Sequence, residues 1–280
     1  MDIIAIQGEE TSFHSDATNI YFGNKKKNVI YCSEFKNVFE LIDNNKSHYG
    51  VIAISNSIAG PIISNYILLN KYKFNIIGEV YLPIKLNLLA LKDINKNDIQ
   101  YIQSHSMAIK QCEIFINKYF PNVKKINKQD TAACSREIYE KKLKKTAAIA
   151  NYKTAIKYKL NILNEDIADN KLNYTRFIVI NKLKSNNYLN ANKSSIIIEI
   201  SFHKSSNILY NIFKILNDYE INISYIQLIP TNLLSDYKIF IDLEWKNYIS
   251  YIKSLTYIKK YSKYVFVLGI YNKFNIKTKN

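Results

Sequence analysis

Short apolar runs alternate with helical stripes of apolar residues through roughly the first two thirds of the chain. Residues 2–7 form an apolar run that ends at Gly8, and residues 11–21 follow with the spacing of an amphipathic helix. The same order recurs with apolar runs at residues 51–54, 99–102 and 123–126, which precede Pro61, Met107 and Thr131. Strands that alternate with helices predict an α/β sheet. Ligands bind such sheets beyond the carboxyl ends of the strands, so we expect the functional residues at these junctions.

A different pattern follows residues 182–194, an Asn-, Ser- and Lys-rich stretch without periodicity that indicates a linker. Residues 195–272 predict strand, helix, strand, strand, helix and strand in turn, which is the ferredoxin-like βαββαβ topology of small regulatory domains. The expected elements are residues 195–202, 207–219, 221–229, 237–243, 246–257 and 264–270. Residues 273–280 carry no core signal and are expected to form a loose tail.

The formal charge of +16, from 39 basic and 23 acidic residues, would suit an acidic partner such as nucleic acid. However, Arg136 and Arg176 are the only arginines, so 37 of the basic residues are lysines. These lysines are scattered along the chain without interleaved aromatic residues or a nucleic-acid-binding motif. We therefore interpret the charge as a solvated lysine surface and expect no nucleic-acid partner. Salt-sensitive retention on DNA would contradict this interpretation.

The remaining composition is that of an ordinary globular protein, with 48% hydrophobic and 22% charged residues in a chain of 280. No apolar run approaches the roughly 20 residues of a membrane helix, and the chain begins without a basic leader segment. Cys32, Cys112 and Cys134 lie far apart without the paired spacing of a disulfide framework or zinc site. We expect a cytoplasmic protein with free thiols and no membrane association.

Five short motifs stand at the predicted strand-to-helix junctions and near the end of the α/β part. Residues 173–177 read Asn-Tyr-Thr-Arg-Phe, and residues 104–112 contain Ser-His-Ser-Met-Ala followed by Gln-Cys. The others are Gly8 with Thr-Ser-Phe at 11–13, Ser-Asn-Ser-Ile-Ala-Gly at 55–60, and Asp-Thr-Ala-Ala at 130–133 with Ala-Ala-Ile-Ala at 147–150. In their order along the chain and in their spacing, the motifs resemble those of monofunctional prephenate dehydratases with a C-terminal ACT domain. The resemblance covers nearly the whole chain.

The resemblance implies a catalytic domain of two α/β lobes, like the type II periplasmic-binding-protein fold, that closes on substrate. It also implies the conversion of prephenate to phenylpyruvate, carbon dioxide and water in L-phenylalanine biosynthesis, and a homodimer or homotetramer formed through the ACT domains. No chorismate mutase segment precedes Gly8, so we expect a monofunctional enzyme. The expected boundaries are lobe 1 at 1–78 and 161–181, lobe 2 at 79–160, the linker at 182–194, the ACT domain at 195–272 and the tail at 273–280.

Prephenate is a dicarboxylate whose ring becomes aromatic as a carboxylate and the ring hydroxyl leave, so the site must hold two anions and help a hydroxyl depart. Hydroxyls, amides, helix N-termini and one guanidinium suffice, and we expect neither metal nor cofactor. Thr175 matches the family's essential threonine and is expected to orient the leaving hydroxyl or relay a proton. The resemblance implies substrate contacts from Asn56, Ser57, Ser104, Gln111, Thr131 and Arg176.

Two of these residues have alternative interpretations from the sequence alone. Arg176 offers a planar bidentate donor for a carboxylate, but it directly follows Thr175, and neighbouring side chains of a strand point to opposite faces. A structural ion pair behind the site is therefore an equal alternative. Gln111 lies on an apolar helix stripe, where an unpaired amide costs about 1–3 kcal/mol. It needs a polar partner, either the substrate or a buried group such as Ser104. His105 is expected to cap a helix.

Several positions depart from the family pattern. Ser55 stands where the family usually has Glu, which removes a carboxylate from the site. In the ACT domain the effector turn lacks glycine and the following strand end lacks charge, so Ser206, Asn207 and Gln227 form a degenerate phenylalanine site. We expect phenylalanine feedback to be weak or absent. The alternative to an active dehydratase is a catalytically impaired two-lobed ligand-binding protein with an ACT module.

Overall fold

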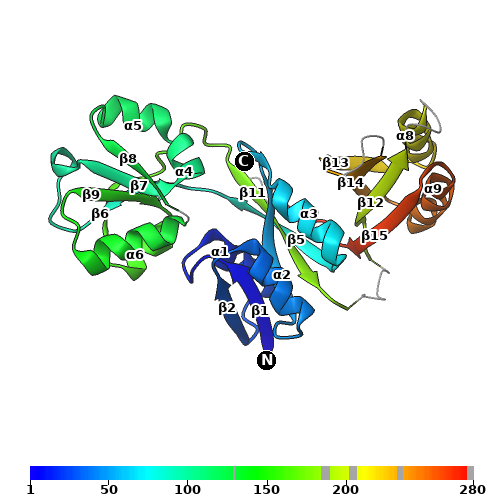
Figure 1. The fold of residues 1–280 in the computed structure, drawn as a ribbon, viewed down its shortest axis with the longest axis horizontal. Coiled ribbons are helices and arrows are strands. Elements are labelled where there is room, and N and C mark those ends of the chain that lie inside the picture. Colours follow the sequence, from blue (N-terminus) through cyan, green and yellow to red (C-terminus); the bar gives the residue numbers. More distant parts are fainter. Residues whose placement is uncertain (129, 184–189, 202–206, 232–235, 276–280) are drawn as a thin grey trace.

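The computed structural model describes residues 1–128, 130–183, 190–201, 207–231 and 236–275, which form three β-sheets with helices packed on them (Figure 1). The first two sheets, together with their helices, form two lobes, and the third sheet belongs to a C-terminal unit. The mixed α/β, two-lobed architecture predicted from the sequence is confirmed.

Lobe 1 is built on a mixed sheet in the order β2-β1-β3-β11-β5, with β4 paired to β3. Strands β1, β2 and β3 are parallel, whereas β11 runs antiparallel between β3 and β5. Ser12 caps helix α1 by accepting a hydrogen bond from the backbone N–H of Ser15. The elements are β1 (Asp2–Gln7), α1 (Phe13–Phe22), β2 (Lys27–Cys32), α2 (Phe35–Asp43), β3 (Tyr49–Asn56), β4 (Gly60–Pro61), α3 (Ile63–Tyr72), β5 (Asn75–Pro83) and β11 (Tyr174–Asn181).

Lobe 2 is built on a second sheet in the order β10-β6-β9-β7-β8, in which β7 is parallel to both β8 and β9. Its helix α6 begins after Asp130, whose carboxylate accepts a hydrogen bond of 2.9 Å from the backbone N–H of Ala133. The elements are β6 (Asn87–Ala90), a 3₁₀ turn (Lys96–Asp98), β7 (Tyr101–His105), α4 (Ser106–Lys110), α5 (Glu113–Tyr119), β8 (Lys124–Lys128), α6 (Thr131–Lys141), β9 (Thr146–Ala150), α7 (Tyr152–Lys157) and β10 (Asn161–Asn164).

The chain crosses between the lobes at positions that differ from the expected boundaries of 78/79 and 160/161. Strand β5 continues past Gly78 to Pro83 as an edge of the lobe 1 sheet, and β10 pairs with β6 in lobe 2. The crossings therefore lie between β5 and β6 and between β10 and β11. The apolar pattern identifies a strand but not the sheet that it joins, which explains the error.

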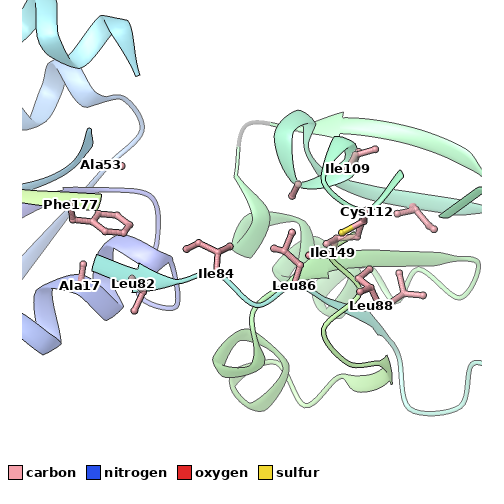
Figure 2. Close-up of a cluster of buried hydrophobic side chains, with 14 of the residues drawn as sticks. Ala17, Ala53, Leu82, Ile84, Leu86, Leu88, Ile109, Cys112, Ile149 and Phe177 are labelled. Atoms are coloured by element: carbon pink, nitrogen blue, oxygen red, sulfur yellow. The ribbon is translucent and has the colours of Figure 1, made fainter. Parts of the chain in front are cut away.

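The hydrophobic core is continuous across the first crossing (Figure 2). Leu82, Ile84, Leu86 and Leu88 are all buried, with the alternation of an extended segment. They belong to one cluster that includes Phe177 of lobe 1 and Ile149 and Cys112 of lobe 2. The crossing is thus packed along its length, and the two lobes share one core at this point.

The C-terminal unit has the predicted βαββαβ order, and its sheet runs β13-β14-β12-β15 with antiparallel neighbours. Its first strand begins at Lys193, two residues before the expected start at 195. One face of the sheet is covered by the two helices. The elements are β12 (Lys193–Ser201), α8 (Ile208–Asp218), β13 (Asn222–Ile229), β14 (Asp236–Glu244), α9 (Tyr248–Tyr261) and β15 (Tyr264–Tyr271).

The other face of this sheet packs on lobe 1. Phe240 and Leu268 share a buried cluster with Tyr66 of α3 and Ile76 of β5. A Cβ atom built on Gly269 would lie 1.9 Å from the carbonyl oxygen of Ile76, so only glycine permits this approach of β15 to β5. The C-terminal unit is therefore docked through a close backbone contact.

Candidate active site

Thr175 and Asn56 lie opposite each other on β11 and β3, at the edge of the lobe 1 sheet where the parallel strands end. The Asn56 side-chain amide donates to the Thr175 hydroxyl at 2.9 Å and to the Asn173 side-chain oxygen at 2.7 Å. It also lies 3.1 Å from the backbone carbonyl of Tyr174. The sequence prediction that Thr175 and Asn56 belong to one polar site is consistent with this geometry.

Gln111 joins this group from lobe 2, where it follows helix α4. Its amide nitrogen donates to the Asn56 side-chain oxygen at 3.3 Å, and its oxygen accepts from the Asn173 amide at 3.0 Å. Asn56, Gln111, Asn173 and Thr175, here called the amide cluster, thus connect the two lobes through hydrogen bonds. The polar partner that Gln111 required is a pair of asparagines, and Ser104 takes no part in it.

A β-bulge positions Asn56. Arg176 pairs with Ser55 and Phe177 with Ala53, so Ile54 is the extra residue of β3. The backbone groups of Ala53 are bound by side chains instead, because its N–H donates to His14 Nε2 at 3.2 Å and its carbonyl accepts from the Asn65 amide at 2.7 Å. Burial lowers the pKa of His14 to about 3, so the imidazole is neutral and able to accept this bond.

Ser57 of lobe 1 and Thr131 of lobe 2 do not join the amide cluster. The Ser57 hydroxyl donates to the Leu172 carbonyl at 3.1 Å and accepts from the Tyr174 N–H at 2.9 Å, so it closes the turn beside β11. Thr131 is the first residue of α6. Among the residues that the structure describes, its side chain forms no hydrogen bond with the cluster.

The position of Ser104 differs from the substrate contact that the sequence predicted. Its side chain is fully buried and donates to the Ile149 carbonyl of β9 at 2.7 Å. The hydroxyl therefore links two strands of the lobe 2 sheet. His105 does cap helix α4 as predicted, since its Nδ1 accepts from the Met107 N–H.

Arg176 is also placed differently from the predicted substrate contact. It forms the ion pair behind the site that was the alternative interpretation. Its side chain is only 2% exposed and lies on the face of β11 opposite to Thr175. It donates to Glu79 at 2.8 Å, to Tyr271 at 3.1 Å and to Asp242. Burial disfavours the charged guanidinium, but the carboxylates of Asp242 and Glu79 outweigh that effect and raise its pKa.

A cleft of about 1170 Å³ opens between the lobes along the same sheet edge. Gly8 and Cys32 line it at the ends of β1 and β2, and Asp130 and Cys134 line it from α6. Gly8 has φ of 96°, and a Cβ there would lie 3.1 Å from the Asp130 carboxylate. Burial raises the pKa of both thiols, to about 12 for Cys134, so neither is a nucleophile at neutral pH.

Ion pairs hold the lobes together beside this cleft. Glu9 accepts from Arg136 at 2.9 Å, and the other two pairs join Glu10 to Lys157 and Asp16 to Lys153. The carboxyl ends of the parallel strands of both sheets face this space, and ligands of α/β proteins bind at such ends.

Sequence reasoning assigned no role to Asn173 or His14. Asn173 is 1% exposed and binds both Asn56 and Gln111. A signal was available, because Asn173 opens the Asn-Tyr-Thr-Arg-Phe motif and stands directly before β11, two residues from Thr175. His14 had no comparable signal, since its partner is a backbone group 39 residues away.

Three further observations concern metal ligands, thiols and membrane-spanning helices. In the part of the chain that the structure describes, no group of three or more His, Cys, Asp or Glu side chains is placed to hold a metal ion. Cys32, Cys112 and Cys134 are free and buried. No helix among the described residues is long and apolar enough to cross a membrane.

Two α/β lobes joined by a shared polar cluster define a two-lobed α/β protein with a candidate ligand site between the lobes. The chain belongs to the prephenate dehydratase family, whose model matches residues 4–185. It is 34% identical over 250 residues to the prephenate dehydratase of Methanocaldococcus jannaschii, which covers 88% of this chain and 89% of that protein. It is 29% identical to the bifunctional chorismate mutase/prephenate dehydratase of Aquifex aeolicus, over 96% of this chain and 73% of that protein.

The fold also matches two solved structures over most of its length. The prephenate dehydratase of Arthrobacter aurescens, determined in complex with L-Phe, aligns with a TM-score of 0.86 at 24% identity and covers 96% of this chain and 90% of that chain. The prephenate dehydratase of Staphylococcus aureus aligns with a TM-score of 0.82 at 22% identity, over 97% of this chain and 100% of that chain.

Proposed function

We propose that this chain is a prephenate dehydratase that converts prephenate to phenylpyruvate, carbon dioxide and water in L-phenylalanine biosynthesis. The observation that carries the proposal is the amide cluster, in which Thr175 is held by Asn56 and connected to Gln111 of the opposite lobe. The cluster lies where β3 of lobe 1 ends, and the first turn of helix α6 lines the interlobe cleft through Asp130 and Ala133. Helix N-termini favour an anionic ligand such as this dicarboxylate.

The hydrogen bonds around Thr175 suit it to assist the departure of a hydroxyl. Its oxygen accepts the Asn56 amide proton, and among the described residues no protein acceptor takes its own proton. That proton is therefore available to a hydrogen bond with the ring hydroxyl of prephenate. Because an isolated threonine is a weak acid, we assign it orientation and relay of a proton, not outright donation.

The reaction needs little further chemistry from the protein. The bond between the ring and its carboxylate breaks, its electron pair enters the ring, and the hydroxyl leaves with one proton as water. Aromatisation supplies most of the driving force. Asn56, Asn173 and Gln111 are neutral donors that can exchange their mutual hydrogen bonds for bonds to substrate when the lobes close on it. Ser55, in the place of the family's usual Glu, adds a hydroxyl and no acid.

The second candidate function is ligand binding without turnover, and the neutral, mutually hydrogen-bonded cluster is the observation that favours it. The two candidates differ in one assay. Purified protein is incubated with prephenate at neutral pH, where the spontaneous acid-catalysed reaction is slow, and phenylpyruvate is measured by its absorbance in base. Binding of prephenate by calorimetry without turnover would establish the ligand-binding protein.

Thr175→Ala tests the proposed role. It should lower kcat by about 100- to 1,000-fold, the range seen when one transition-state hydrogen bond is removed. Its cost in folding should be about 1 kcal/mol, because the Asn56 amide keeps Asn173 and Tyr174 as acceptors. Thr175→Ser is the matched control, since it keeps the hydroxyl and should keep most of the activity. A Thr175→Ala enzyme with near-normal kcat would reject the assignment.

For the C-terminal unit, we propose an ACT domain that forms a homodimer or homotetramer, in a monofunctional, cytoplasmic enzyme. The βαββαβ order and the sheet topology support the ACT domain. Of the three residues of the degenerate effector site, Ser206 lies outside the described residues. Asn207 precedes helix α8, and the Gln227 amide donates to the adjacent Leu228 carbonyl at 2.8 Å. This bond turns Gln227 toward its own strand, which supports weak or absent phenylalanine binding.

A further inference from the structure

We propose that Arg176 is a positioning residue, and that the C-terminal unit, through Asp242, holds strand β11 in the register that presents Thr175 to the amide cluster. The inference rests on the proposed role of Thr175. It differs from effector regulation, because the coupling is a permanent contact that needs no ligand.

The two faces of β11 at this point serve different partners. Thr175 faces the amide cluster, and Arg176 faces away from it, toward the C-terminal unit. The guanidinium binds Glu79 on the neighbouring strand β5, Asp242 on β14 and Tyr271 on β15. One side chain thus joins lobe 1 to two strands of the C-terminal sheet.

The surrounding charges are buried and paired. Asp242 is fully buried and also accepts from Ser195, whose hydroxyl contacts Tyr271. Glu79 accepts from Lys193 at 2.9 Å. Lys193 also lies 3.6 Å from Glu244, so each of these buried charges has a partner of opposite sign. Loss of the Asp242 charge would leave the buried Arg176 charge only partly compensated. Removing one partner of a buried ion pair strongly destabilises the fold.

The position of Arg176 in the strand explains why its anchoring affects catalysis. The bulge in the β3–β11 pairing falls between Arg176 and Phe177. At a bulge the ladder of backbone hydrogen bonds is locally disrupted, so the register of β11 against β3 depends more there on side-chain anchors. His14 and Asn65 fix the β3 side of the bulge at Ala53. Arg176 fixes the β11 side, one residue from Thr175.

The test compares two carboxylates on the same strand of the C-terminal unit. Asp242→Asn removes the charge that faces Arg176. Asp236→Asn is the matched control, because Asp236 is also on β14 and ion-paired, but with Lys263 at 2.8 Å within the C-terminal unit. Both variants are assayed with prephenate at a temperature where circular dichroism shows them folded. Hydrogen–deuterium exchange is measured on the peptide that contains residues 174–181.

We expect Asp242→Asn to lower kcat by about tenfold or more with KM roughly unchanged, because misplacement of one catalytic group acts on the reaction step. Exchange in β11 should be faster in this variant, and Asp236→Asn should match the parent in both measurements. A purely structural role would lower the unfolding temperature of both variants and leave kcat unchanged.

Three outcomes would overturn the proposal: normal kcat in folded Asp242→Asn, an equal loss in Asp236→Asn, or unchanged exchange in β11. If Asp242→Asn does not fold, Tyr271→Phe decides by the same criteria, since it removes only the hydroxyl that binds Arg176. If the parent protein does not turn over prephenate, the proposed function fails, and the exchange of β11 still decides whether Asp242 positions the strand.

Discussion

Replacing Gly269 by alanine adds one methyl group at the closest contact between the C-terminal unit and lobe 1. The new carbon would lie 1.9 Å from the Ile76 carbonyl oxygen, 2.8 Å from its carbon and 2.9 Å from its nitrogen. All three are main-chain atoms of β5, which is hydrogen-bonded to β11 and cannot rotate away as a side chain would. Strand β15 must therefore move away from β5 to accept the substitution.

The size of the effect follows from these distances. An ordinary carbon contact begins at 3.4 Å, so the backbones must move apart by about 1.5 Å, the difference from 1.9 Å. That movement loosens the buried cluster around Tyr66, Phe240 and Leu268. Overpacking of a core costs about 1–3 kcal/mol, and we expect the upper end because the opposing atoms are backbone. At about 2–4 °C per kcal/mol, the unfolding temperature should fall by about 6–12 °C.

Thermal unfolding by circular dichroism measures the loss, and small-angle X-ray scattering detects separation of the units as a larger radius of gyration. Ile270→Val is the control, because Ile270 packs with the helix-covered face of the same sheet. Removal of its methyl should cost about 0.5–1.5 kcal/mol without changing the scattering. If the free energy of unfolding of Gly269→Ala lies within about 1 kcal/mol of the parent value and the scattering is unchanged, the close docking is refuted.

Two further predictions concern protons and effectors. His14 is neutral in the fold with a pKa near 3 and titrates near 6.5 when unfolded, so the unfolded state binds more protons between these values. The free energy of unfolding should fall as pH drops from about 6.5 toward 3. Urea denaturation of His14→Gln at several pH values should show a smaller decrease in this free energy over the same range. An equal decrease in the variant and the parent would exclude His14 as the source. Phenylalanine should change neither activity nor oligomeric state, because an effector without differential affinity cannot shift two states. Isothermal titration beside an activity curve checks this, and micromolar binding coupled to inhibition would contradict it.

The part of the site that sequence could predict consists of residues in the short motifs at element ends. Asn56, Gln111 and Thr175 are far apart in sequence, yet each stands at a junction or in a motif whose place in an α/β fold is fixed by topology. The fold brings all three into one hydrogen-bonded cluster. Local patterning suffices for Asn56, which stands at the carboxyl end of the parallel strand β3. Thr175 begins an antiparallel strand and Gln111 ends a helix, so their place in the site came from the family motifs.

The residues that sequence could not place depend on tertiary contacts. A strand predicts that Arg176 points away from Thr175, but its partner Asp242 lies in another unit, and nothing local specifies which face of that unit docks. Ser104 precedes a helix, as a ligand-binding serine would, yet its hydroxyl binds the carbonyl of a neighbouring strand. Only the pairing of β7 with β9 decides between these uses.

The central place of β11 in the lobe 1 sheet has a consequence for synthesis on the ribosome. Strands β3 and β5 are made early, but the strand that pairs with both begins at Tyr174, about 90 residues after β5 ends at Pro83. At translation rates of about 5–20 residues per second, these two strands wait about 5–18 s with unpaired edges. Such edges recruit other extended chains. The nascent chain therefore passes through an aggregation-prone interval during which a chaperone that shields β3 and β5 would raise the yield of folded protein.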